Sequence, residues 1–436
     1  MSVAARSEVE LSPTRSWHWA HVLAGACAVV LVAATCEVVL DGALDHSLLI
    51  PKSPPIAGWL SGIGERLGLR VFLTALLASA AAYAGVLALS RRFSKRAAIA
   101  LLGVLHLIVF AGPILLSTDV FSYIAYARMG VEHGVNPYLH GPIAIASDPV
   151  FPYVGQDWKH TATAYGPLYT LLSYPLAPLG LRAAIWGMKL EALLASAVTL
   201  SLTWRCARKR GLDPVAATLA VGANPLYVLY GLGGAHNDLI MLALMMAAVS
   251  LTFADRDAPA AASVVAGALV KATVATLLPF MLLAKRRASQ LFAAAATLGL
   301  GAVVAYAAFG THGVDIVSAL NRDAAFVSTD SFPTEIAHLF GKPGVFPVDH
   351  DLLKAALVVI AAHMLWRTWR GYDWVSASGW TLLAISVTST WLLAWYILWP
   401  LPLAVVARDR RLLVATLLVQ AFFIAHQTAP LFAPVS

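Results

Sequence analysis

The sequence predicts an all-α, polytopic membrane protein, a transmembrane helical bundle. Of its 436 residues, 59% are hydrophobic and only 12% are charged, and the mean hydropathy is +0.75. Soluble domains contain about 25% charged residues. Apolar runs of the roughly 20 residues that a helix needs to cross a bilayer recur along nearly the whole chain. We therefore expect residues 1–436 to form a single integral-membrane domain of about 11 to 13 membrane segments, some of them short or re-entrant.

The basic residues are grouped in short clusters between the apolar runs. The clusters lie at 91–96, 205–210, 285–287 and 408–411. This pattern is typical of cytoplasmic loops, and it excludes nucleic acid as the partner that a net charge of +7 could suggest. Two of the three cysteines lie in the first apolar run and the third in a basic cluster, so no external disulfide framework is expected.

Placing every basic cluster in the cytoplasm gives a topology for the first half of the chain. Residues 1–96 hold an N-terminal helix pair near 18–40 and 71–90, of which the first is a retained membrane helix rather than a signal peptide. A helix near 97–116 then brings the chain to the outer face at Ser117. The segment 117–164 is therefore expected to be an external loop.

The same charge accounting predicts two interrupted elements in a core at 97–310. Only one full membrane crossing fits between the external loop and the next basic cluster. We therefore expect residues 165–180 to form a re-entrant segment and residues 183–204 to form the membrane-spanning helix. Both ends of 258–284 are expected to be cytoplasmic, which indicates a hairpin of half-length helices with Lys271 near its apex. Non-helical backbone at membrane depth requires surrounding protein or a water-filled cavity. A cavity near the bilayer midplane is therefore predicted.

In the last part of the chain, as in the first, the external loops are long and the cytoplasmic links are short. A helix near 289–309 leads to a second external loop at 311–349, and region 350–436 holds helices near 350–366, 374–390, 392–407 and 411–430. The external loops are long and rich in Asp, His, Pro and Gly, whereas the cytoplasmic links are short. Chemistry is therefore expected on the extracytoplasmic side of a multi-pass cell (inner) membrane protein.

Residues 117–138, "STDVFSYIAYARMGVEHGVNPY", carry the leading catalytic candidate. Thr118 is a natural N-cap, and Asp119, Tyr123 and Tyr126 share one face of the helix that follows. The pattern predicts a short amphipathic helix lying on the outer leaflet. Asp119 has two open readings: it stabilises the positive end of the helix dipole, or it is a general base whose basicity is restored by partial burial.

Several other polar residues lie at membrane boundaries. Asn136, Tyr138 and Tyr165 occupy Pro- and Gly-containing turns, either as substrate contacts or as interfacial belt residues. His236, Asn237 and Asp238 begin a helix, where Asp238 could also serve as a cap. Intramembrane ionisable groups are functional suspects by default, which adds Lys271 as a phosphate contact or as the partner of an acid.

The spacing of the histidines in the first external loop matches no known metal site, so no metal is predicted. The external cations Arg128 and Arg322 are weaker candidates for a phosphate, because such residues are usually solvated or face headgroups.

The order of short motifs along residues 97–407 resembles the GT-C superfamily of integral-membrane glycosyltransferases. The motifs are an acid directly after a membrane helix, "YGPLY", "NPL" followed by "HND", and "GALVKATVATLLPF". Within that superfamily the chain looks most like the bacterial polyprenyl-phosphomannose-dependent α-mannosyltransferases. One departure is that two helices precede the helix that leads to the acid.

The resemblance implies an inverting transfer of a hexose, mannose in such enzymes, from a polyprenyl-phosphate donor to an extracytoplasmic glycan or glycolipid, without a cofactor. It assigns the base to Asp119, cavity-lining positions to His236, Asn237 and Asp238, and the hairpin lysine to Lys271. Together with the residue-level reading, the predicted donor phosphate contacts are Lys271, Arg128 and Arg322, and the predicted substrate contacts are Tyr123, Tyr126, Asn136, Tyr138, Tyr165, His236, Asn237 and Asp238. Two alternatives stay open: a transporter or flippase of lipid-linked sugars, and a non-catalytic partner in an envelope-synthesis complex.

Overall fold

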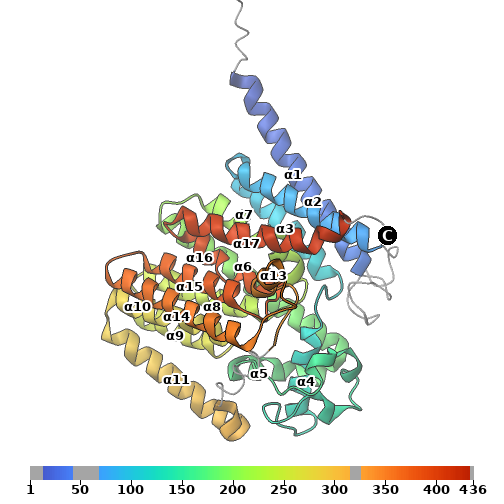
Figure 1. The fold of residues 1–436 in the computed structure, drawn as a ribbon, viewed down its shortest axis with the longest axis vertical. Helices are drawn as coiled ribbons and strands as arrows, with labels where there is room; N and C mark the ends of the chain where they lie inside the picture. Colours follow the sequence, from blue (N-terminus) through green and yellow to red (C-terminus); the bar gives the residue numbers. More distant parts are fainter. Residues whose placement is uncertain (1–12, 43–67, 315–325, 433–436) are drawn as a thin grey trace, which may run out of the picture.

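The structure, a computed structural model, describes residues 13–42, 68–314 and 326–432. These residues are helical or irregular and contain no strand, which confirms the all-α fold class. Figure 1 shows the helices stacked in layers, with α1 projecting at one end and α11 lying along the opposite edge. Arg322, one of the predicted phosphate contacts, lies outside the described residues.

The first layer joins the two ends of the chain. Its helices are α1 (Pro13–Gly42), α2 (Leu69–Ala88), α3 (Lys95–Ala111) and α17 (Arg410–Thr428). The first helix packs against both α2 and α3, and α17 packs against α2, as Figure 1 also shows. The predicted apolar runs thus form long helices, because roughly 20 apolar residues satisfy their own backbone hydrogen bonds only as a helix.

The second layer holds the centre of the chain. It contains α6 (Gly180–Lys209), α7 (Pro214–Gly222), α8 (Asp238–Phe253), α9 (Asp257–Ala268) and α11 (Ala288–Phe309). Helix α8 packs between α6 and α9, and α9 packs against α11. The third layer contains α10 (Leu277–Lys285), α14 (Pro347–Trp369), α15 (Trp374–Thr388) and α16 (Leu401–Val406).

A separate lobe forms around α4 (Asp119–Val131), visible at the lower right of Figure 1. The short helices packed against α4 are η2 (Pro142–Ile145), η3 (Phe151–Tyr153), α5 (Pro167–Ser173) and η5 (Tyr174–Leu179). The other short helices are η1 (Ser90–Arg92), η4 (Gln156–Trp158), η6 (Leu226–Leu232), η7 (Ala272–Thr276), η8 (Gly310–Val314), α13 (Phe332–Leu339), η9 (Ala394–Leu398) and η10 (Ala429–Leu431).

Polar caps fix several helix starts beside the basic clusters. Ser94 accepts a hydrogen bond from the Ala97 amide at the start of α3, and Asp213, Asp373 and Asp409 cap α7, α15 and α17. Each cap satisfies amide groups that would otherwise lack an acceptor.

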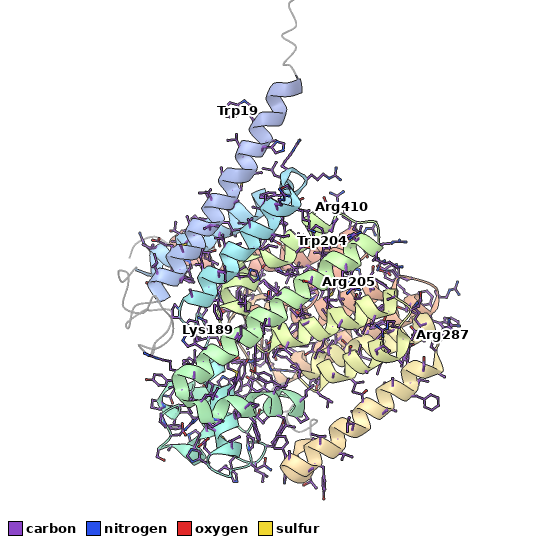
Figure 2. All side chains as sticks on the ribbon, turned by 180° about the vertical axis from the view of Figure 1, so that it is seen from behind. Trp19, Lys189, Trp204, Arg205, Arg287 and Arg410 are labelled. Atoms are coloured by element: carbon purple, nitrogen blue, oxygen red, sulfur yellow. The ribbon has the colours of Figure 1, made fainter. Side chains whose placement is uncertain are left out.

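Residues of three basic clusters lie toward one side of the molecule. Figure 2 shows Arg205, Arg287 and Arg410 in one half of the view and Lys189 in the other half.

Five helical stretches are long and apolar enough to cross a membrane. They are Trp19–Gly42, Leu69–Ala88, Pro167–Lys209, Ala288–Gly313 and Arg410–Leu431. The pair Pro214–Gly222 and Leu226–Leu232, bent by 50°, makes a sixth if it is counted as one span. The described residues thus support a multi-pass membrane protein with five or six spans by this criterion. The 11 to 13 segments expected from the sequence, some of them short or re-entrant, stay a prediction.

The surface position predicted for the helix after Ser117 is wrong. Every residue from Asp119 to Ala127 is buried, because α5, α6, η2, η3 and η5 pack around α4. Amphipathic spacing alone does not distinguish a lipid surface from the wall of a polar cavity. In this chain the polar face of α4 turns inward, toward the site described next.

Candidate functional site

A cavity of about 500 Å³ lies where α4, the break after α9, α14 and the segment after α15 meet. Its polar lining comes from distant parts of the sequence: Asp119, Tyr126, Tyr165, Lys271, Thr273, His350, Lys354, Thr388, Ser389, Thr390 and Tyr396. Four tryptophans complete the wall, at positions 158, 391, 395 and 399. One carboxylate and two lysines therefore face the same enclosed space.

Asp119 reaches the cavity from the first turn of α4. Its side chain is 11% exposed, and its backbone amide donates to Ser117 Oγ at 3.1 Å. The Thr118 side chain makes no capping hydrogen bond. The residue before Ser117, Leu116, has a φ of 59°, a left-handed conformation that costs a bulky residue about 1–3 kcal/mol. This turn therefore places the carboxylate toward the cavity at the expense of backbone strain.

A second tight turn brings His236 to Asp119. The wide turns of the π-helix η6 lead to Gly233 and Gly234, and Ala235 takes a φ of 50°. His236 Nδ1 then lies 3.6 Å from Asp119 Oδ2, and its ring stacks on Trp395 with centroids 3.6 Å apart. The imidazole is fully buried, so it is held in one orientation against the carboxylate.

Lys271 forms the other charged wall of the cavity. It lies in extended backbone between α9 and η7, at the break where the sequence predicted the apex of a hairpin. Its ammonium group donates to both oxygens of Asp238 at 2.9 Å, and Trp399 Nε1 donates to Asp238 Oδ1 at 2.6 Å. The same ammonium lies 4.6 Å from the ring centroid of Tyr396, within range for a cation–π contact.

A cluster of tyrosines packs beside His236 and Asn237. Tyr123 donates a hydrogen bond to Asn237 Oδ1 at 3.4 Å and lies 3.3 Å from His236 Nδ1. Its ring packs edge-on against Tyr165 and Tyr169, with centroids 4.8 and 5.1 Å apart. Behind this cluster, His236 Nε2 and Asn237 Nδ2 are buried and have no hydrogen-bond partner among the described residues.

The surroundings of Asp119 shift its acidity. Burial raises its pKa to about 7, although the charge of Lys271 opposes the shift. Burial, followed by the charge of Lys271, also lowers the pKa of His236, so this imidazole is neutral near pH 7. Asp119 is therefore poised to exchange a proton near neutral pH, which is the property that a general base requires.

Of the predicted site residues, Tyr123, His236, Asn237 and Asp238 do not line the cavity themselves. Three others, Arg128, Asn136 and Tyr138, hold the scaffold together instead of lining it. Arg128 forms an ion pair with Asp148 at 2.9 Å and donates to the Ala177 carbonyl. Asn136 Nδ2 donates to the Phe309 carbonyl at 2.8 Å, which ties the lobe to α11. Tyr138 donates to the Tyr165 carbonyl at 2.9 Å and so supports that tyrosine from behind.

Two walls of the cavity were not predicted from the sequence, the aromatic wall around η9 and the wall formed by α14. Trp391, Trp395, Tyr396 and Trp399 come from "WLLAWYILWP", which reads as one more membrane helix but here forms η9 and irregular turns. Three tryptophans within nine residues were the available signal. His350 and Lys354, on α14, gave no such signal, because their helix begins in a polar segment. Within the described ranges, no three His, Cys, Asp or Glu side chains are grouped as a metal site would need.

Comparison with known proteins gives the family. The model of the alpha-(1->6)-mannopyranosyltransferase N-terminal domain matches residues 22–287, which is more than half of the chain. The chain belongs to this family. The model of glycosyltransferase family 87 matches residues 163–434, so the two matches together span the residues that line the cavity, and they confirm the resemblance to GT-C mannosyltransferases. No solved structure matches the chain.

Two curated relatives show how far the family likeness extends. Alpha-(1->6)-mannopyranosyltransferase A of Mycobacterium tuberculosis is 27% identical over 342 residues, covering 71% of this chain and 66% of that protein. The protein of the same name from Corynebacterium glutamicum is 29% identical over 177 residues, covering 40% of this chain and 36% of that protein. The chain thus spans less than two thirds of the length of these relatives.

Proposed function

We propose that this family member transfers mannose from a polyprenyl-phosphate donor to a hydroxyl group of an extracytoplasmic glycan or glycolipid. The observation that supports this proposal best is that Asp119 and Lys271 line one cavity of about 500 Å³. The relatives are named for transfer to form an alpha-(1->6) linkage, and we extend that linkage to this chain as part of the proposal.

The proposed reaction is a single displacement. Asp119 takes the proton of the acceptor hydroxyl, and the hydroxyl oxygen attacks the anomeric carbon of the donor. The bond between that carbon and the phosphate oxygen breaks, and polyprenyl phosphate leaves with the bonding electrons and inversion at the carbon. Neutral His236, held by Trp395, keeps the carboxylate aimed at the cavity.

The leaving phosphate requires cations but no proton. An ammonium group has three donors, and Asp238 occupies two of those of Lys271, which leaves one for a phosphate oxygen. Lys354 of α14 also lines the cavity and adds a second positive charge. Preorganised cations of this kind stabilise charge that develops during the reaction. Leu353 and Leu357 of α14 also line the cavity and offer an apolar path for the first prenyl units.

The decisive experiment compares sugar transfer by the purified wild type and Asp119→Asn. Labelled mannose on a short-chain polyprenyl phosphate serves as donor, and an α-mannoside as acceptor. Because a general base contributes about 10²- to 10⁴-fold, turnover is expected to fall by at least 100-fold. Asp157→Asn, an exposed carboxylate in the same lobe, is the matched control and should retain activity.

Two results would overturn parts of the proposal. Unchanged turnover in Asp119→Asn would remove the base assignment and leave Asp119 as a dipole-stabilising residue. No transfer from any polyprenyl-phosphate sugar, combined with movement of that lipid across sealed vesicles, would instead support the flippase alternative.

A further inference from the structure

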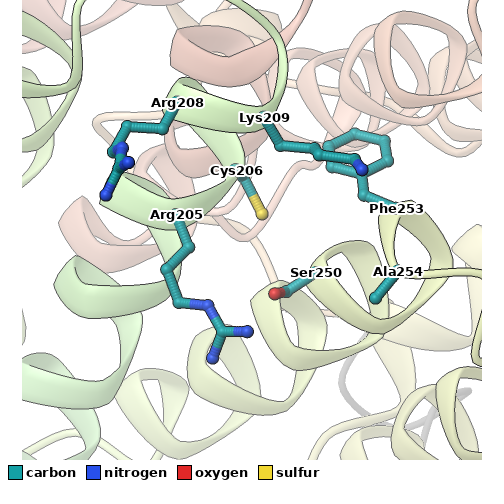
Figure 3. A pocket seen from close by; sticks show the side chains of 7 residues that line it. All are labelled: Arg205, Cys206, Arg208, Lys209, Ser250, Phe253 and Ala254. Atoms are coloured by element: carbon teal, nitrogen blue, oxygen red, sulfur yellow. The ribbon is translucent and has the colours of Figure 1, made fainter.

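A second polar hollow, of about 350 Å³, lies at the C-terminal ends of α6 and α8. Three cations line it, Arg205, Arg208 and Lys209, together with Ser250 and Phe253, and no carboxylate is part of the lining. Figure 3 shows the side chains of Arg205 and Cys206 directed toward Ser250. The hollow therefore offers several hydrogen-bond donors to an anion.

The acids nearest to this hollow are already paired. Asp373 forms an ion pair with Arg210 at 2.9 Å, and Asp255 forms one with Lys285 at 2.7 Å. Within the part of the chain that the structure describes, no ion pair involves Arg205, Arg208 or Lys209. The charge of Asp255 still acts on Lys209, but none of the three lining cations is held in an ion pair there.

An apolar groove of about 650 Å³ continues from the same arginine along the outside of the bundle. It runs between α3 and α6 and is lined mainly by Ile99, Leu102, Gly103, Leu107, Leu193 and Ala197. Arg205 lines both the hollow and the groove. Lys95, whose ammonium lies 5.4 Å from the ring centroid of Trp204, marks the same end of the groove.

The dimensions of the groove match one lipid chain. From Lys95 to Leu107 helix α3 advances roughly 18 Å, at 1.5 Å per residue. One leaflet of the hydrocarbon core is about 15 Å thick, half of the roughly 30 Å total. An acyl chain that begins at the basic end would therefore fill the groove and end near the bilayer midplane.

We propose that this surface is a binding site for an anionic glycerophospholipid. The lipid phosphate lies among Arg205, Arg208 and Lys209, and one acyl chain occupies the groove between α3 and α6. The general preference of membrane proteins for basic residues on one side explains a cluster of charges, but it does not explain why an apolar groove begins at the same arginine. The site is separate from the cavity of Asp119, so it is independent of the proposed transfer reaction.

The experiment is native mass spectrometry of the purified full-length protein, titrated with phosphatidylglycerol or phosphatidylcholine of the same acyl composition. Wild type is expected to retain one phosphatidylglycerol more tightly than phosphatidylcholine. Replacing Arg205, Arg208 and Lys209 with Gln should weaken retention by roughly a hundredfold, since each basic residue near an anionic lipid contributes a factor of about five. Replacing Arg408, Arg410 and Arg411 with Gln removes the same charge elsewhere and should leave this lipid bound.

A second pair of variants tests the groove without changing charge. A Cβ added at Gly103 meets no protein atom within 4 Å. Gly103→Leu is therefore expected to fill the groove, keep the fold and weaken phosphatidylglycerol binding by at least tenfold. Gly299→Leu on α11, equally unobstructed, is its matched control. If Gly103→Leu has no effect and glycerol 1-phosphate displaces the lipid fully, the site binds free phosphates and the lipid assignment is wrong. Equal retention of both lipids would overturn the proposal altogether.

Discussion

Burial of a single carboxylate gives the candidate site a pH dependence that can be measured. Burial raises the pKa of Asp119 to about 7, and the proposed base acts only when deprotonated. We therefore expect kcat/KM to rise with pH through about 7 and to level off above it. The pKa of His236 is lowered by burial, so its titration would give a limb at more acid pH. A pH profile of transfer for wild type checks this expectation.

Asp119→Glu provides the control for that profile, because a longer carboxylate should retain an acid limb while its position on the pH axis moves. A limb near pH 7 that persists unchanged in Asp119→Asn would assign the titration to another group.

Loss of Arg128, which holds the α4 lobe together, is expected to lower stability rather than to affect the reaction directly. Arg128→Ala removes one partner of Asp148, whose side chain is 1% exposed, and leaves that charge with His133 and the Val150 amide. Breaking a buried ion pair costs about 3–5 kcal/mol, and 15% exposure of Arg128 favours the lower end. The Tm of the detergent-purified protein should fall, and Arg128→Lys should recover part of the loss. An unchanged Tm with a raised donor KM would return Arg128 to the phosphate site.

At the scale of elements, a contact between two backbones positions Lys271. The amide of Gly166 donates to the Val270 carbonyl at 3.1 Å, and the amide of Leu168 donates to the Leu269 carbonyl at 3.0 Å. A Cβ at position 166 would lie 2.0 Å from the Leu269 carbonyl oxygen, so only glycine allows this approach. The start of α5 and the end of α9 are therefore locked together directly before the lysine.

Gly166→Ala is expected to displace the segment that carries Lys271 and to raise the donor KM at least tenfold, with a lower Tm. Steady-state transfer at varied donor concentration measures the effect. Gly299→Ala, where a Cβ meets nothing within 4 Å, controls for loss of glycine as such. A folded Gly166→Ala protein with the wild-type donor KM would show that the position of Lys271 does not depend on this contact.

The helix bounds show which elements can be predicted from the sequence and which cannot. The bounds of α2, α11 and α17 lie within two residues of the predicted helices, because long apolar runs between charges have few alternatives. The helix predicted near 392–407 is interrupted in the structure, because "WLLAWYILWP" is as apolar as a helix but its break is set by tertiary contacts with α8 and Lys271. The sequence indicates Asp119, His236, Asp238 and Lys271 as candidates because ionisable groups beside apolar runs are conspicuous. The cavity tryptophans were missed because interfacial tryptophan is common in membrane proteins.

For the whole molecule, the distribution of charge argues for one orientation in the membrane. Figure 2 places Arg205, Arg287 and Arg410 in one half of the molecule, and these residues belong to three of the basic clusters. The cavity is lined in part by Trp158, Ala162 and Ala164, which belong to the segment 117–164. Because basic loops favour the cytoplasm, the lobe around α4 is expected outside.

Cysteine labelling in cells tests this orientation. In a variant whose cysteines at 27, 36 and 206 are replaced by serine, Leu139→Cys adds a thiol at a position that is 48% exposed in the α4 lobe. A membrane-impermeant maleimide should label it in intact cells, whereas Arg410→Cys should react only after permeabilisation. Labelling of Leu139→Cys only in permeabilised cells would place the α4 lobe inside. Such a result would remove the extracytoplasmic acceptor from the proposal, because a glycan outside the cell could not reach Asp119 from that side.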